Sequence, residues 1–324
     1  MRYISELIDE KRNVRTMDGS VLLKDRNRIK PENSVNLLAL GDVGGTVLLG
    51  LRLLGGAAIR EIGIYDINDN VMRRYEREIN QVFFPDGRAL PHVRILEEKE
   101  LFNCDMFVFC ASKGVPPVGA SGDVRMAQLE ANRGLVSMYA ERAAKCGFDG
   151  IFAVVSDPVD PLCKAALLAG LAPEQVQGYG LGVMNGRAAY FAEKSEGLKH
   201  YLKDGRAFGP HGEDLVIADS VTDYDDEISR ELTRLTVSSN METRADGFKP
   251  YIAPAMSSGA ISLIETLSGG WNYSSVFLGA GASGAFLGCR NRRTEEGIQI
   301  ENLPIDEKLF QRIEKAYDNL KELL

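Results

Sequence analysis

From residue 35 onward the chain alternates short apolar runs with segments of helical length, and this alternation limits the folds open to it. Strands that are apolar on both faces and are separated by helices are typical of a parallel sheet covered by helices on both sides. Periodicity predicts strands at 35–40, 61–65, 92–96, 106–111 and 151–156, and helices at 46–54, 71–84 and 125–145.

The pattern changes after about residue 178, where helices and strands no longer alternate regularly. A helix at 304–324 has a clear apolar stripe, and three short strands before it suit an antiparallel ribbon. The predicted helices of this half are 185–202, 225–235, 251–267 and 304–324, and the predicted strands are 214–221, 275–278, 285–289 and 298–303.

Composition excludes several classes of protein. A formal net charge of −8 over 324 residues argues against a nucleic-acid surface. No apolar run is long enough to span a membrane, and residues 1–33 lack the apolar core of a signal peptide. The five cysteines show no metal-ligand spacing, so we expect reduced thiols and no metal site. These features predict a cytoplasmic protein of enzyme size.

A glycine turn, Ala39-Leu40-Gly41-Asp42-Val43-Gly44, follows the first predicted strand and opens the first helix. Two glycines of the dinucleotide fingerprint are present, and Ala39 stands where the first is usual. Gly41 would let the backbone approach a pyrophosphate at the helix N-terminus, and Gly44 would let helix and strand pack closely. Asp66 ends the second strand, where a carboxylate binds ribose hydroxyls and favours NAD over NADP. The alternative is a structural turn with a strand-capping aspartate.

Two further motifs follow later strands. Residues 112–124 are rich in glycine and proline and lead into a helix that carries Arg125 and Asn132. Such a loop could close over a ligand and bring Arg125 inward, although a plain surface loop beside a solvated arginine is the alternative. The run Asp157-Pro158-Val159-Asp160 follows another strand, at the sheet edge where ligands of parallel sheets bind.

His211 lies in the glycine-flanked run Phe208-Gly209-Pro210-His211-Gly212, and Arg187 lies 24 residues before it. An imidazole exchanges a proton near neutral pH, and a guanidinium grips a carboxylate with two parallel hydrogen bonds. Together they are what an enzyme needs to interconvert a 2-hydroxy acid and a 2-oxo acid. The other two histidines have plainer surroundings, and an ordinary surface or core histidine is the alternative for any one of them.

With these motifs the chain resembles the L-lactate/malate dehydrogenase family over residues 35–324. The resemblance implies a Rossmann-type doubly wound parallel sheet at 34–178, followed by an α+β substrate domain at 179–324. Residues 1–33 would be an arm or short helix, with a neighbouring subunit as one surface for packing. The family pattern implies NAD binding by Gly41, Asp42, Val43, Gly44, Asp66, Ala111 and Asn132, catalysis by His211, Arg125 and Asp157, and substrate binding by Arg187 and Asn132.

The chain departs from the family pattern at two positions. The family has an aspartate, hydrogen-bonded to the histidine, three residues before the substrate arginine, and here that residue is Met184. The family's asparagine in the Asn-Pro signature is Asp157. The two changes can be one exchange, in which Asp157 stabilises the imidazolium of His211. Alternatively, Asp157 only caps its strand and the activity is impaired.

The resemblance predicts an NAD-dependent dehydrogenase that acts on a small 2-hydroxy or 2-oxo acid as a homodimer or homotetramer. The apolar segment 115–118, without a second cation, favours a lactate-type substrate over malate. A family member that binds NAD but has lost or altered catalysis is the rival hypothesis, and Met184 supports it. A purely structural oligomer is a further alternative.

Overall fold

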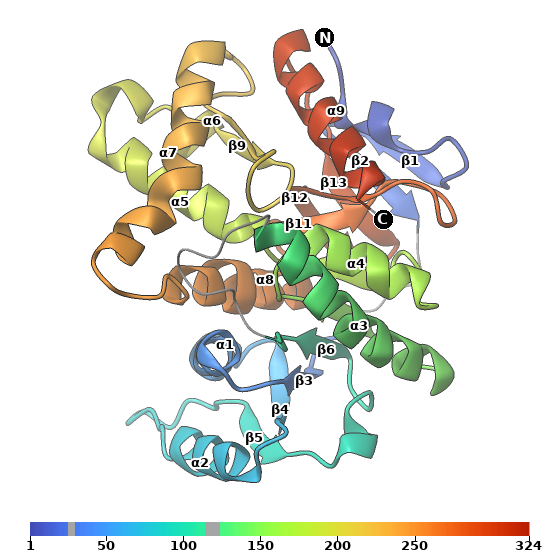
Figure 1. Cartoon of the computed structure of the whole chain (residues 1–324), viewed down its shortest axis with the longest axis vertical. Helices are drawn as coiled ribbons and strands as arrows, with labels where there is room; N and C mark the ends of the chain where they lie inside the picture. Colours follow the sequence, from blue (N-terminus) through green and yellow to red (C-terminus); the bar gives the residue numbers. More distant parts are fainter. Residues whose placement is uncertain (25–29, 114–123, 324) are drawn as a thin grey trace.

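The computed structural model of the protein describes residues 1–24, 30–113 and 124–323, and for residues 124–128 it describes the backbone alone. Its centre is a mixed sheet whose described strands run in the order β1-β2-β13-β12-β11-β8-β7-β6-β3-β4-β5 (Figure 1). The strand order reverses between β3 and β6, and β3 pairs in parallel with both β4 and β6. This arrangement is the doubly wound pattern expected from the sequence. The parallel strands are β3 (Asn33–Leu38), β4 (Ile59–Tyr65), β5 (His92–Ile95), β6 (Met106–Phe109), β7 (Ile151–Val154) and β8 (Val176–Gly178).

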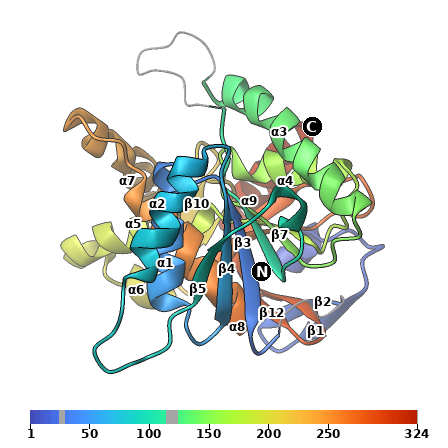
Figure 2. The same cartoon turned by 90° about the horizontal axis from the view of Figure 1, so that it is seen from below.

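Helices cover both faces of this parallel part, as the sequence pattern predicts. Figure 2 shows α1 and α2 on one face of the sheet and α3 on the other. Buried aromatic rings fill the second interface, where the centroids of Phe107 and Phe152 lie 5.0 Å apart beneath Tyr139 of α3. The helical elements of this half are α1 (Asp42–Leu54), α2 (Asp69–Asn80), η2 (Glu98–Glu100), α3 (Val124–Lys145) and α4 (Val159–Leu168).

The second half places three helices around a two-stranded sheet. These elements are α5 (Leu181–Lys194), α6 (Tyr201–Asp204), β9 (Arg206–Phe208), β10 (Val216–Ala218) and α7 (Asp226–Ala245). The predicted helix 185–202 is wrong in extent, because Ser195 is extended (φ −133°, ψ 122°) and ends α5. The chain then forms the 3₁₀ turn η3 (Glu196–Leu198) before α6.

The predicted helix at 251–267 forms as two different helices. Residues Pro254–Ile261 are a π-helix, η4, which continues as the α-helix α8 (Ser262–Ser268). Small residues bring this segment against α1: a Cβ atom at Gly259 would lie 2.6 Å from Val47, and one at Gly50 would lie 2.4 Å from Ala260. This close approach fastens the second half of the chain to the helix that the glycine turn opens.

The ribbon of β11 (Asn272–Phe277), β12 (Phe286–Thr294) and β13 (Gly297–Glu301) is antiparallel, as predicted. It continues the main sheet, because Ser275 of β11 pairs with Gly178 of β8. The terminal helix α9 (Glu307–Glu322) packs its apolar stripe on the cluster that contains β12 and β13.

The expectation that residues 1–33 form an arm or short helix is wrong for residues 14–24. After a single turn, η1 (Ile4–Leu7), the chain forms a hairpin of β1 (Val14–Met17) and β2 (Ser20–Lys24). Strand β2 pairs with β13 of the same chain, and its Val21 and Leu23 are buried against the ribbon. The structure of this largely polar segment is therefore decided by the burial of its few apolar side chains against strands that lie far along the sequence. No helix in the described ranges is long and apolar enough to cross a membrane.

Candidate active site

The glycine turn forms at the carboxyl end of β3 and opens α1. Ala39 has a φ of 74°, a conformation that favours glycine, at the position where the fingerprint has its first glycine. A Cβ atom at Gly44 would lie 1.9 Å from the carbonyl oxygen of Ala39, so nothing larger than glycine fits there. A Cβ atom at Gly41, the N-cap residue, would meet nothing within 4 Å. The turn thus fits a pyrophosphate, since the helix N-terminus is approachable and favours an anion.

Asp66 is fixed beside the glycine turn by two backbone hydrogen bonds. Its Oδ2 atom accepts a hydrogen bond from the Leu40 N–H at 2.7 Å, and its Oδ1 atom accepts one from the Asn68 N–H at 2.9 Å. The carboxylate therefore caps the end of β4 and at the same time lies next to the turn. Both interpretations of Asp66, a strand cap and a ribose ligand, are consistent with this position.

The other residues of the predicted cofactor site lie on the same edge of the sheet. Val43 lines the pocket described below. Ala111 lies two residues after the end of β6, and its carbonyl oxygen accepts a hydrogen bond from the Ser156 hydroxyl at 2.8 Å. Asp42, the first residue of α1, forms an ion pair with Lys249 from the second half of the chain.

Asn132 is fully buried and ties two loops together. Its Nδ2 atom donates to the carbonyl oxygen of Asp157 at 2.8 Å and to the Ser112 hydroxyl at 3.3 Å. Its Oδ1 atom accepts from the Lys113 N–H at 2.9 Å. In this conformation Asn132 holds the chain segments after β6 and β7 in place beneath the pocket.

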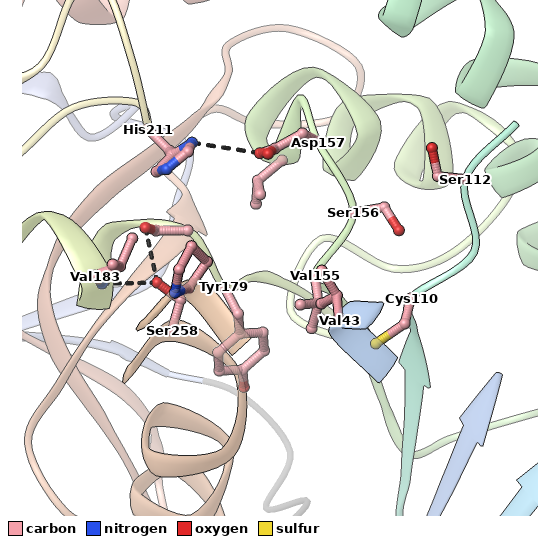
Figure 3. Close-up of a pocket in the computed structure, with 13 residues that line it drawn as sticks. Val43, Cys110, Ser112, Val155, Ser156, Asp157, Tyr179, Val183, His211 and Ser258 are labelled. Carbon is pink, nitrogen blue, oxygen red and sulfur yellow. Dashed lines mark hydrogen bonds and ion pairs between the residues drawn. The ribbon is translucent and has the colours of Figure 1, made fainter. Parts of the chain in front are cut away.

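His211 and Asp157 face each other across the pocket (Figure 3). Nδ1 of His211 lies 3.4 Å from Oδ1 of Asp157, and their side chains are 19% and 47% exposed. His211 lies in the loop between β9 and β10, where Gly209 has a φ of 86° and Gly212 a φ of 144°. Those two conformations favour glycine and turn the histidine toward the end of β7.

Arg187 and Met184 lie one turn apart on α5 and contact each other. Nη1 of Arg187 is 3.6 Å from the Met184 sulfur, and both residues are buried. Burial lowers the pKa of the Arg187 guanidinium, while the nearby negative charge of Asp157 opposes that shift. Arg187 therefore lies close enough to Asp157, the partner of His211, for the two charges to interact. Arg125 belongs to the first turn of α3, and its side chain lies outside the described residues.

A second carboxyl group, Asp160, lies behind the pocket at the start of α4. It is 3% exposed, and its Oδ1 atom has no hydrogen-bond partner in the described structure. Burial raises its pKa to about 6, and both a hydrogen bond with Ser275 and the proximity of His211 act in the opposite direction. The last residue of the Asp-Pro-Val-Asp motif is therefore buried, and its pKa lies well above that of an ordinary aspartate.

The pocket has a volume of 130 Å³, and residues from both halves of the chain line it. Sequence reasoning found Val43, Asp157 and His211 among its residues. Positions directly after β6, β7 and β8 could have been found from the rule that parallel strands bind ligands at their carboxyl ends. Ser258 and Pro254 lie on η4 and carry no local signal. The lining residues missed from the sequence are Cys110, Ser112, Val155, Ser156, Val159, Tyr179, Gly180, Val183, Pro254 and Ser258.

The thiols and acidic groups do not form a metal site in the described part of the chain. No cluster of three or more histidine, cysteine, aspartate or glutamate side chains is placed there to hold a metal ion. The five cysteines are free thiols, and burial raises the pKa of Cys110 in the pocket wall to about 12. That thiol consequently stays protonated at neutral pH.

The doubly wound sheet and the glycine turn at its switch point are the features of a dinucleotide-binding α/β protein, and the His211–Asp157 pair lies at the same edge of the sheet. Residues 34–178 match the family model described as lactate/malate dehydrogenase, NAD binding domain. Over these residues the chain matches the lactate/malate dehydrogenase family, in agreement with the resemblance seen in the sequence.

Two curated relatives show how far the sequence similarity extends. The L-lactate dehydrogenase of Staphylococcus saprophyticus is 26% identical over 182 residues, covering 56% of this chain and 55% of that protein. The L-lactate dehydrogenase of Treponema denticola is 29% identical over 192 residues, covering 59% and 58%. The chain thus spans little more than half the length of the curated relatives it matches.

Solved structures share the fold over most of the chain. A lactate dehydrogenase from a Medee basin deep-sea metagenome library has a TM-score of 0.75 at 17% identity, covering 91% of this chain and 98% of its own. The malate dehydrogenase of Archaeoglobus fulgidus in complex with NADH has a TM-score of 0.71 at 16% identity, covering 90% and 98%. At these identities the likeness establishes the α/β fold, which is the fold class predicted from the sequence.

Proposed function

We propose that the protein is an NAD-dependent dehydrogenase that interconverts a small 2-hydroxy acid and its 2-oxo acid. The observation that carries this proposal is the contact of His211 with Asp157, 3.4 Å apart, in a pocket that adjoins the NAD-binding domain. A histidine beside a carboxylate is suited to take a proton and to hold the resulting positive charge.

Each residue has a distinct task in the oxidation direction. When NAD is bound, its nicotinamide supplies a hydride acceptor. The imidazole of His211 takes the proton of the substrate hydroxyl, and the carboxylate of Asp157 stabilises the imidazolium. Arg187 pairs with the substrate carboxylate, and its buried position strengthens that pairing. In the reverse direction Arg125 polarises the carbonyl of the 2-oxo acid, as the family motif implies.

The pocket supports a lactate-type substrate in preference to malate. Its walls contain the apolar side chains of Val155, Val183 and Pro254, and segment 115–118 is apolar in the sequence. A second carboxylate on the substrate would meet the negative charge of Asp157 instead of a second arginine. The closest fit is therefore a monocarboxylic 2-oxo acid with a small apolar side chain.

A second candidate function rests on the contact between Met184 and Arg187. Where the family has a carboxylate for the histidine, this chain has a thioether that touches the substrate arginine. A protein that binds NAD and a carboxylic acid without turnover would be compatible with that substitution. Such a protein would still need Asp66 and Arg187 but would not depend on His211.

The decisive experiment mixes the purified protein with NADH and a panel of 2-oxo acids and follows the loss of NADH absorbance. Turnover of pyruvate-like acids above oxaloacetate supports the lactate-type assignment. The His211→Asn variant is the matched control, and it should bind NADH with unchanged affinity while losing turnover. NADH binding without any turnover across the panel would favour the second candidate function.

We further propose that the protein assembles as a homodimer or homotetramer. Helices α1 and η4, which pack together, expose three large apolar side chains: Leu49 at 42%, Leu53 at 44% and Ile261 at 44%. Apolar patches of this kind are typical of subunit contacts. Light scattering coupled to size-exclusion chromatography measures the subunit number, and a monomer at micromolar concentration would contradict the proposal.

A further inference from the structure

An ion pair joins the two halves of the chain at the mouth of the glycine turn. Nζ of Lys249 lies 2.8 Å from Oδ2 of Asp42, and the two side chains are 81% and 49% exposed. Asp42 is the first residue of α1, whereas Lys249 precedes η4, 207 positions along the chain. The hydrogen bond from Lys249 raises the pKa of that lysine, so its ammonium stays charged at neutral pH.

Asp42 has opposite effects on the helix and on the proposed cofactor. In the first turn of α1 its negative charge interacts favourably with the helix dipole. A pyrophosphate bound at the same N-terminus brings two more negative charges to the same place. Like charges at such a distance disfavour binding unless a cation offsets them. The glycine turn of this chain therefore carries a charge that acts against its own ligand.

We propose that Lys249 is a cofactor-positioning residue whose ammonium group offsets Asp42 and faces the pyrophosphate of NAD. The inference rests on the proposed NAD-dependent function. It assigns a role in the cofactor site to the segment between α7 and η4, which the sequence motifs do not include. An isolated surface ion pair, with little energetic effect, is the competing explanation.

Charge arithmetic at this site distinguishes the two explanations. The parent pair sums to zero, Lys249→Met leaves −1, Asp42→Asn leaves +1, and the double variant returns to zero. We expect Lys249→Met to weaken NADH binding about tenfold, and Asp42→Asn to strengthen it by a similar factor, because unit charges a few ångströms apart at a protein surface interact at that scale. The double variant should bind as the parent does.

The experiment measures dissociation constants for NADH, ADP-ribose and adenosine by titration calorimetry. NADH and ADP-ribose carry the pyrophosphate and should follow the charge series, whereas adenosine lacks phosphate and should not. The matched control is Lys145→Met, which removes one charge from another exposed ion pair, with Lys145 78% exposed. Raising the salt concentration should compress the series, since these charges are open to solvent.

Three results would overturn the inference, and they are distinguishable. If Lys249→Met binds NADH like Lys145→Met, Lys249 has no cofactor role. If Asp42→Asn weakens binding as much as Lys249→Met does, the pair acts as a structural tether between the two halves. If the parent protein binds neither NADH nor ADP-ribose, the proposed function fails together with the inference. Thermal unfolding of each variant shows whether the fold is retained, which both exposed positions lead us to expect.

Discussion

Nδ1 of His211 lies 3.4 Å from Oδ1 of Asp157, although the two residues are separated by 54 positions and lie in different halves of the chain. The residue that would support the histidine in the family pattern, Met184, instead contacts Arg187. In this chain the carboxylate beside the histidine therefore comes from the carboxyl end of β7 and not from α5. The compensating exchange is a prediction that this contact motivates.

Moving the carboxylate from position 157 to position 184 tests the idea of a compensating exchange. We expect Asp157→Asn alone to lower kcat/KM about 100-fold, because the imidazolium loses its counter-charge. The double variant Asp157→Asn with Met184→Asp should recover much of the loss. Steady-state kinetics of the two single variants and the double variant measures the coupling. An Asp157→Asn enzyme as active as the parent would show that Asp157 only caps its strand.

Replacing Arg187 by lysine separates substrate binding from cofactor binding. Lysine keeps the charge but lacks the planar fork that pairs with a carboxylate through two hydrogen bonds. We expect KM for the 2-oxo acid to rise about 100-fold, in line with the loss of a charge-assisted hydrogen bond in a buried site. The dissociation constant of NADH should stay within about twofold of the parent value. Unchanged oxo-acid binding would make Arg187 a structural residue.

The carboxylate of Asp66 should set the cofactor preference. A 2′-phosphate would meet this negative charge beside the glycine turn, so we expect NADH to bind about 100-fold more tightly than NADPH. The Asp66→Asn variant should narrow that gap, mainly through tighter NADPH binding. Asparagine retains an oxygen for the Leu40 N–H, which keeps the turn in place. Equal affinities of the parent for both cofactors would contradict the assignment.

The buried carboxyl group of Asp160 predicts a specific dependence of stability on pH. Its folded-state pKa of about 6 exceeds the ordinary value of 3.8, so the stability it contributes is complete below about pH 3.8 and is lost as the pH rises through 6. That shift corresponds to about 3 kcal/mol of unfolding free energy. We expect Asp160→Asn to lack this loss, so its stability relative to the parent should increase between pH 4 and pH 7. Urea unfolding at several pH values checks it, and a constant difference would show that Asp160 does not titrate in this range.

Local patterns were sufficient for most of the parallel half of the fold, although they did not predict α4 or β8. Strand β6 and strand β7 are apolar throughout and buried on both faces, so their composition alone marks them. The glycine turn is equally local, because Gly44 must lack a side chain to clear the carbonyl of Ala39. The family motifs are likewise local in sequence, so the resemblance to the family does not depend on tertiary contacts.

The sequence by itself predicted the candidate site residues and the parallel strands from β3 to β7. Only the tertiary structure decided that β2 joins the sheet beside β13, that η4 is a π-helix and that Asp157 reaches His211. Each of these depends on contacts between segments far apart in the chain, whose energies no local window contains. The ion pair between Asp42 and Lys249 also depends on such long-range contacts, because Lys249 reaches Asp42 only after both halves of the chain have packed together.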